Sequence, residues 1–235
     1  MTNIEKELLQ LKDDIIEMMF LVESQLQKSK KAFTKLKTGL AKEIHRMEAR
    51  VNSMAHSINK DCENIIALYN PVASDLRLVL AAIKIVINLE RIGDHADNIA
   101  RYVRKEILVE PYDDEILEKV GFDEIFSTAL EMVKEAIAGF HNEDTEIARK
   151  VFDKDAAINA IYKKSAPILS EYIQAHPDQT SRMLYLFSII NKLERVGDLA
   201  TNISEETIFY IEAELKLPSK KKKSSSKSSS KDDKK

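Results

Sequence analysis

Apolar residues recur every three or four positions along most of the chain, which is the spacing of one face of an α-helix. Two clear series are Ile44, Met47, Val51, Met54 and Ile58, and Leu89, Ile92, Ala96, Ile99 and Val103. Interruptions of this spacing divide the chain before position 219 into six segments. Each segment predicts a helix of about 25 to 35 residues, a length typical of an up-down helical bundle.

The interruptions coincide with residues that begin or end helices. They are Thr38-Gly39, Asn70-Pro71, Pro111 to Asp114, Gly139 to Asn142, and His176 to Asp178. Asn70 is predicted to cap the start of the third helix, with Pro71 in its first turn. Pro167 lies inside the fifth segment, and we expect it to kink that helix without ending it.

The composition supports an all-α fold. Only 5 Gly and 5 Pro occur in 235 residues, and Trp is absent. An all-β protein needs many tight turns, which these two residue types usually form. The single cysteine, Cys62, excludes a disulfide framework and is expected to be a buried, inert thiol.

Charge is distributed unevenly along the chain. Residues 219–235 consist only of Lys, Ser and Asp, with 8 Lys and 2 Asp, and we expect this tail to be disordered. Because the whole chain has a net charge of -3, the remainder has a net charge of -9. An acidic body favours cations as partners over nucleic acid.

The protein is expected in the cytoplasm and not in a membrane. No stretch approaches the roughly 18 consecutive apolar residues that a membrane-spanning helix requires. The first residues lack the basic and apolar regions of a signal peptide.

The sequence contains an internal repeat. The segment Leu89-Glu-Arg-Ile-Gly-Asp-His-Ala-Asp-Asn-Ile-Ala100 recurs 104 positions later as Leu193-Glu-Arg-Val-Gly-Asp-Leu-Ala-Thr-Asn-Ile-Ser204. Upstream, Val51, Ile58 and Asn59 match Val151, Ile158 and Asn159, 100 positions later. We therefore predict two tandem three-helix bundles related by a pseudo-twofold axis, residues 1–110 and 111–218.

The repeated motif places oxygen-bearing side chains on one side of a helix. Glu90 and Asp94 are one helical turn apart, and Asp97 and Asn98 fall on the same side. The second copy repeats this arrangement with Glu194, Asp198 and Asn202. Like charges four residues apart destabilise a helix by a few tenths of a kcal/mol. Two such series, which we call the acidic ladders, therefore suggest a bound cation.

A metal site also requires ligands from a second helix. The offset of 100 residues pairs Ala55 and Asn59 in the first half with Asp155 and Asn159 in the second. The first site thus lacks a carboxylate at these two aligned positions, and the second site should bind a cation more strongly. Glu48 and Asn52 are further candidate ligands on the polar face of the same helix. His45 and His56 also fall on this face, where a histidine is more often only solvated. Oxygen ligands with occasional imidazole suit Fe, Zn, Mn or Mg.

Two further residue types accompany the ladders. Gly93 and Gly197 lie in helix interiors, where Gly costs about 1 kcal/mol relative to Ala, so close approach of another helix or a ligand is expected. Arg91 and Arg195 are expected to form ion pairs that hold neighbouring helices. Motifs for other chemistry are absent from the sequence: it has no glycine-rich phosphate loop, nucleophile elbow or His-Glu-x-x-His.

The doubled motif, preceded by Asn70-Pro-Val-Ala-Ser-Asp-Leu-Arg77, resembles the PhoU family of phosphate-uptake regulators. The resemblance implies two three-helix bundles, frequent homodimers and, in some members, metal clusters on acidic helix faces. It also implies a cytoplasmic, non-catalytic adaptor between the ATPase subunit of the phosphate ABC transporter and the phosphate-sensing histidine kinase. Such an adaptor represses the phosphate-starvation response.

Two alternatives remain from the residues themselves. One is a di-metal hydrolase or oxidase, although outward-facing carboxylates do not form the enclosed site that such chemistry favours. The other is a purely structural helical protein whose acidic faces bind nothing specific.

Overall fold

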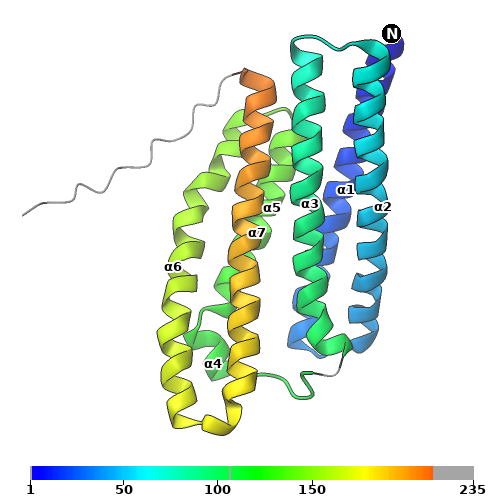
Figure 1. Cartoon of the computed structure of the whole chain (residues 1–235). Helices are drawn as coiled ribbons and strands as arrows, with labels where there is room; N and C mark the ends of the chain where they lie inside the picture. Colours follow the sequence, from blue (N-terminus) through cyan, green and yellow to red (C-terminus); the bar gives the residue numbers. More distant parts are fainter. Residues whose placement is uncertain (1, 106, 214–235) are drawn as a thin grey trace, which may run out of the picture.

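The computed structural model describes residues 2–105 and 107–213. Within these ranges the chain forms helices and no strand (Figure 1). The helices are α1 (Asn3–Thr34), α2 (Thr38–Tyr69), α3 (Ser74–Arg104), α4 (Asp114–Lys119), α5 (Phe122–His141), α6 (Thr145–Ala175), the 3-10 helix η1 (Pro177–Gln179) and α7 (Thr180–Glu212). The predicted disordered tail at 219–235 lies outside the described residues.

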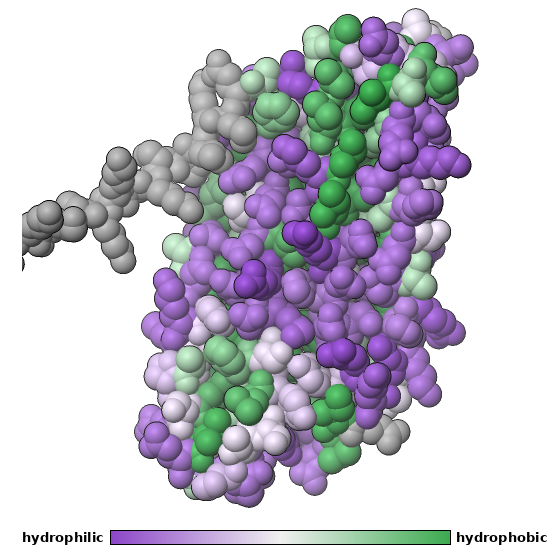
Figure 2. All heavy atoms as spheres, in the orientation of Figure 1, coloured by the Kyte–Doolittle hydropathy of each residue, from purple (hydrophilic) through white to green (hydrophobic). Residues whose placement is uncertain are grey.

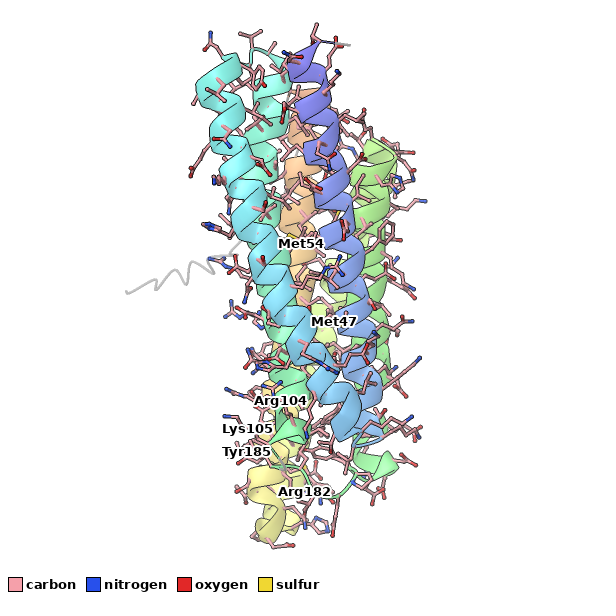
Figure 3. The ribbon with its side chains drawn as sticks, turned by 90° about the vertical axis from the view of Figure 1, so that its right-hand side faces the viewer. Met47, Met54, Arg104, Lys105, Arg182 and Tyr185 are labelled. Atoms are coloured by element: carbon pink, nitrogen blue, oxygen red, sulfur yellow. The ribbon has the colours of Figure 1, made fainter. Side chains whose placement is uncertain are left out.

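The long helices form two three-helix units, α1 to α3 and α5 to α7. Helices α2, α3, α7 and α6 lie side by side on the face towards the viewer in Figure 1, and α1 and α5 lie behind them, as the side view also shows (Figure 3). The predicted all-α fold of paired three-helix bundles is therefore confirmed, with the short α4 as an addition.

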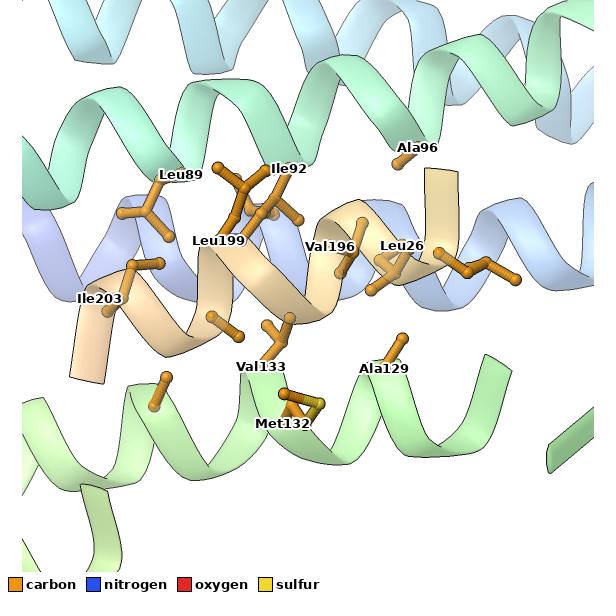
Figure 4. Packing of buried hydrophobic residues seen from close by; sticks show 14 of the residues in the cluster. Leu26, Leu89, Ile92, Ala96, Ala129, Met132, Val133, Val196, Leu199 and Ile203 are labelled. Atoms are coloured by element: carbon orange, nitrogen blue, oxygen red, sulfur yellow. The ribbon is translucent and has the colours of Figure 1, made fainter. Parts of the chain in front are cut away.

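The two units share one hydrophobic core. Helix α3 packs along α7, and α1 packs against α5. In the centre, Leu89 and Ile92 of α3 lie beside Leu199 and Ile203 of α7, with Met132 of α5 close by (Figure 4). These side chains are almost entirely buried. Because burial of apolar surface is the main favourable contribution to folding, this junction stabilises both units.

One predicted helix start is wrong. Asn70 is the C-terminal cap of α2, with φ of 46° and ψ of 59°, and α3 begins four residues later at Ser74. Asn adopts this left-handed conformation more readily than other residues with a side chain, because it can form local hydrogen bonds. Pro71 then prevents α2 from continuing.

Three other local expectations can be compared with the structure. Pro167 lies within α6, which continues to Ala175, so the proline does not end the helix. Helix α5 continues through Gly139 and ends at His141, so the interruption predicted from Gly139 to Asn142 begins two residues too early. Cys62 is buried, as predicted, and burial raises the pKa of its thiol to about 12.

Candidate functional site

Both acidic ladders lie on the face formed by α2, α3, α7 and α6. On α3, Asp94 is exposed, while Glu90, Asp97 and Asn98 are half-buried. On α7, Asp198 and Asn202 are exposed, and Glu194 is half-buried. Asp155 and Asn159 of α6 are half-buried. Each ladder therefore lies within reach of the neighbouring helix of its own unit.

In the first unit the ladder meets a buried carboxyl group from α2. Only 6% of Glu48 is exposed, and the Gln25 amide Nε2 donates a hydrogen bond of 2.7 Å to its Oε2. Burial raises the pKa of Glu48 to about 7, and the neighbouring carboxylates of Asp94 and Asp97 also raise it. The hydrogen bond from Gln25 lowers it. Glu48, a candidate ligand from the sequence, is therefore buried at the junction of α2 and α3.

Gly93 explains why Glu48 can be buried there. A Cβ atom at position 93 would lie 2.8 Å from Glu48 Oε2, 3.1 Å from Gln25 Oε1 and 3.3 Å from Val51. Without a side chain, α3 leaves room for the carboxyl group of α2. The close approach expected at this glycine is confirmed.

Asp97 is held by two basic side chains from the part of the chain that the structure describes. Arg104 forms an ion pair with it, and His45 Nδ1 lies 3.2 Å from its Oδ2. These contacts occupy both carboxylate oxygens. The ion pair with Arg104 lies within α3, and the contact with His45 joins α3 to α2.

In the second unit, residues of α6 and α7 are brought together. Burial raises the pKa of Glu194, and the negative charges of Asp198 and Asp155 raise it further, against the opposing charge of Arg195. The Asn159 amide donates a hydrogen bond of 3.1 Å to Asp155 Oδ2. Asn202 is separated from this group, because its amide donates to Asn88 Oδ1 of α3 at 3.3 Å.

The structure corrects the alignment of α2 with α6. A Cβ at Gly93 would contact Val51, whereas a Cβ at the equivalent Gly197 would contact Ile158. Val51 therefore corresponds to Ile158, an offset of 107 residues, and not to Val151. A second pair of contacts gives the same offset. In the first unit Lys28 contacts Met47, which is labelled in Figure 3, and 107 residues later Glu135 contacts Lys154.

With this offset, Asp155 corresponds to Glu48 and Asn159 to Asn52. Ala55, the partner predicted from the sequence, is a core residue with 3% exposed, and Asn59 is half-buried one turn further along. The first unit thus has a carboxyl group at the position that the sequence alignment left empty. The alignment that paired Ala55 with Asp155 is therefore wrong, and stronger cation binding by the second site stays a prediction.

The sequence predicts metal binding by the ladder residues. In the ranges that the structure describes, no three His, Cys, Asp or Glu side chains are placed to hold one metal ion. The Glu48 carboxyl group lies against Asp94, and Asp97 lies against Arg104. A site for Fe, Zn, Mn or Mg on these helices stays a prediction.

Comparison with known proteins identifies the family. The model of the PhoU domain matches this chain twice, at residues 15–103 and 122–207. The chain belongs to the PhoU family. The two PhoU domain matches correspond to the two three-helix units, so the duplication predicted from the sequence has a counterpart in the fold.

The relatives match over most of their length. The "Phosphate-specific transport system accessory protein PhoU homolog" of Pseudomonas putida is 33% identical over 205 residues, which is 87% of this chain and 79% of the relative. The homolog of Aquifex aeolicus is 32% identical over 213 residues, 89% of this chain and 93% of the relative.

Two solved structures have the same fold. The crystal structure of PhoU from Pseudomonas aeruginosa superposes with a TM-score of 0.82 and 32% identity, covering 89% of this chain and 99% of that one. The PhoU structure from Streptococcus pneumoniae gives a TM-score of 0.77 at 25% identity, covering 91% and 99%. Among the described residues, no helix combines the length and apolarity needed to cross a membrane.

Proposed function

We propose that this protein is an accessory of a phosphate transport system and regulates it as an adaptor without catalysis. The observation that carries the proposal is the presence of two PhoU domains that together account for nearly all of the two helical units. Relatives that match most of this chain are named as phosphate-specific transport system accessory proteins.

In this proposal the protein is cytoplasmic and contacts two partners. It binds the ATPase subunit of the phosphate ABC transporter and the phosphate-sensing histidine kinase, as a homodimer, and keeps the phosphate-starvation response off when phosphate is plentiful. Long helices around a buried apolar core suit this role, because they present extended surfaces to partners.

The exposure of the ladders favours an adaptor over a di-metal enzyme. Asp94 and Asp198 are exposed on a helix face. Hydrolytic chemistry on a metal usually occurs in a cavity that excludes bulk water and strengthens the electrostatic interactions inside it. Phosphatase turnover by the purified protein that depends on an added metal would support the enzyme instead.

Deletion of the gene is expected to leave phosphate-starvation genes expressed in medium with abundant phosphate. The measurement is transcript abundance in the deletion strain and in a strain complemented with the full chain. Complementation should restore repression. Normal repression in a deletion strain that has no second PhoU gene would contradict the adaptor role.

A further inference from the structure

Helix α3 carries apolar side chains outside the core. Its broad buried face packs against α1, α2 and α7. On its solvent side, Leu80 and Ile87 are 42% and 40% exposed, and Ile83 between them is half-buried. We call these three residues the first apolar stripe. Their spacing of three and four residues is that of a narrow helix edge that packs along one other helix.

Helix α7 carries a second apolar stripe, which consists of Leu184 and Phe187. These residues follow Leu80 and Ile83 by 104 positions, the offset of the duplicated motif. Leu184 is 57% exposed and Phe187 is half-buried, so the exposure of each resembles that of its counterpart. Single exposed apolar residues are common on proteins, whereas similar exposure at equivalent positions of both units indicates a shared role.

The second stripe is extended by α6 and not further along α7. Asn191 stands where the first stripe has Ile87, and its amide donates a hydrogen bond of 3.1 Å to the Tyr162 hydroxyl. The Tyr162 ring stacks on Phe187 with a distance of 5.7 Å between the ring centres. Both stripes therefore offer apolar contact area, and the second takes part of it from an aromatic ring.

Contacts between α3 and α7 fix how the two stripes are placed. Three pairs join the helices: Lys84 Nζ lies 3.0 Å from Glu206 Oε1, the Asn202 amide donates to Asn88 Oδ1 at 3.3 Å, and the Tyr102 hydroxyl donates to Ser188 Oγ at 3.1 Å. Each step forward along α3 matches an equal step back along α7. The helices are therefore antiparallel with one constant register.

This register places the stripes on opposite sides of the pseudo-twofold axis. Gly93 lies level with Gly197, its equivalent in the repeat, so the axis crosses the contact of α3 with α7 at this point. At a rise of 1.5 Å per residue, Leu80 and Leu184 are about 40 Å apart along the helices. Figure 2 shows apolar surface towards opposite ends of this face, with hydrophilic surface between.

The cation beside the first stripe does not cover it. Lys84, one turn after Leu80, forms an ion pair of 3.0 Å with Glu206 of α7. Its Nζ also lies 5.8 Å from the centre of the Phe209 ring. Lys84 is thus directed towards α7 and leaves the first stripe accessible.

The exposed residues between the stripes carry charges of both signs. Arg91 and Asp94 follow the first stripe, and Arg195 and Asp198 follow the second at equivalent positions. These local charges do not select the sign of a partner. The net charge of -9 of residues 1–218 does, because the field of an acidic body attracts a basic partner.

We propose that the two apolar stripes are equivalent docking sites for an amphipathic, basic helix from each protomer of a twofold-symmetric partner protein. A narrow edge bordered by charged side chains fits one helix, whereas a lipid surface requires a broad apolar face. Because a pseudo-twofold axis relates the sites, a partner with a true twofold axis can fill both in the same way. One chain then bridges the two protomers of its partner.

This inference adds a partner-binding surface to the proposed adaptor function, and it rests on that function only in taking the occupant to be a partner protein. Its test requires neither the transporter nor the kinase. A failure of either proposal can therefore be recognised separately.

Titration of the full chain with peptides tests the sites and their spacing. The first probe is a synthetic helical peptide of about 18 residues, with Leu along one edge and Lys and Gln elsewhere. The second probe joins two copies through a Gly/Ser linker of about 50 residues, whose average span is about 40 Å. We expect two single peptides per chain by calorimetry, and one tandem peptide bound at least about tenfold more tightly.

Leu80→Ser removes the first site, and Leu184→Ser removes the second. Each variant is expected to bind one single peptide per chain and to lose the affinity gain of the tandem peptide. The double variant should bind neither probe. Ile87→Ser is a second variant of the first site. All three positions are exposed, and circular dichroism checks that the variants are folded.

Leu9→Ser and Leu68→Ser are the matched controls, because each removes an exposed leucine outside the stripes. Both should still bind two single peptides with unchanged affinity. Binding of fewer than two peptides by the original chain, no gain from the tandem peptide, or equal losses in the controls would overturn the proposal.

Light scattering and co-sedimentation with anionic vesicles test two other occupants. If the double variant Leu80→Ser, Leu184→Ser abolished self-association of the chain, the stripes would belong to a second copy. If it abolished vesicle binding, they would belong to a lipid surface. Either result would also overturn the proposal.

Discussion

The substitution Gly139→Ala is expected to lower the free energy of unfolding by about 2 to 4 kcal/mol. A Cβ at this position of α5 would lie 2.8 Å from the Cβ, 2.9 Å from the backbone N and 3.0 Å from the Cα of Ala148 in α6. Backbone atoms cannot move aside as the end of a long side chain can, so α5 and α6 must separate. Alanine's better helix propensity, about 1 kcal/mol, offsets only part of this cost.

Urea denaturation followed by circular dichroism measures this effect, and Gly39→Ala provides the control. Gly39 lies at the start of α2, and a Cβ added there would have no neighbouring atom within 4 Å. Here the same change should stabilise the protein by about 0.5 kcal/mol, because only the helix propensity changes. Equal stability of the two variants would contradict the close approach of α5 to α6 at Gly139 and Ala148.

The second large effect concerns Glu48, whose pKa is raised from the ordinary 4.5 to about 7 by burial. Between these pH values the folded chain keeps a proton that the unfolded chain has lost. The stability contributed by protonated Glu48 is therefore present below pH 4.5, falls as the pH rises, and is lost above about pH 7.

The variant Glu48→Gln cannot ionise and should avoid this loss. It is expected to be more stable than the original chain by about 1 to 3 kcal/mol at pH 8, and about equally stable near pH 4. The new amide can still accept the hydrogen bond from Gln25 and can donate to Asp94. Urea denaturation at a series of pH values measures the difference.

Glu43→Gln is the matched control on the same helix. Glu43 is half-buried and paired with Lys28, and that hydrogen bond and charge lower its pKa. The ionised form of Glu43 therefore stabilises the fold above its ordinary pKa, and its substitution should cause a small loss of stability at pH 8. A Glu48→Gln variant that is less stable than the original chain at pH 8 would contradict the inference that burial raises the pKa of Glu48.

Much of the fold follows from local features of the sequence. The three-and-four spacing of apolar residues predicted the long helices, and the duplicated motif predicted two similar units. Helix ends were harder to predict, because some residues suit two roles. Asn70 can cap a helix start through its side chain or end a helix in the left-handed conformation, and only the packing of α2 against α3 decides between them.

The candidate site was predicted only in part. The offsets of 100 and 107 residues that relate α2 to α6 differ by seven residues, about two helical turns. Both offsets therefore match the same helix faces, and the spacing of apolar residues cannot show which offset is correct. Gly93 and Gly197 were the signal that could have decided between them, because each marks where the neighbouring helix approaches. The burial of Glu48 depends on the contact of α2 with Gly93 of α3, which the sequence pattern does not specify.

The most direct test of the adaptor proposal is quantitative co-purification of the tagged full chain from cells grown with abundant phosphate. The protein is expected to recover the ATPase subunit of the phosphate transporter, or the phosphate-sensing histidine kinase, well above the level obtained with an unrelated tagged helical protein. Recovery of neither partner above that level, when both are detected in the same lysate, would contradict the adaptor function.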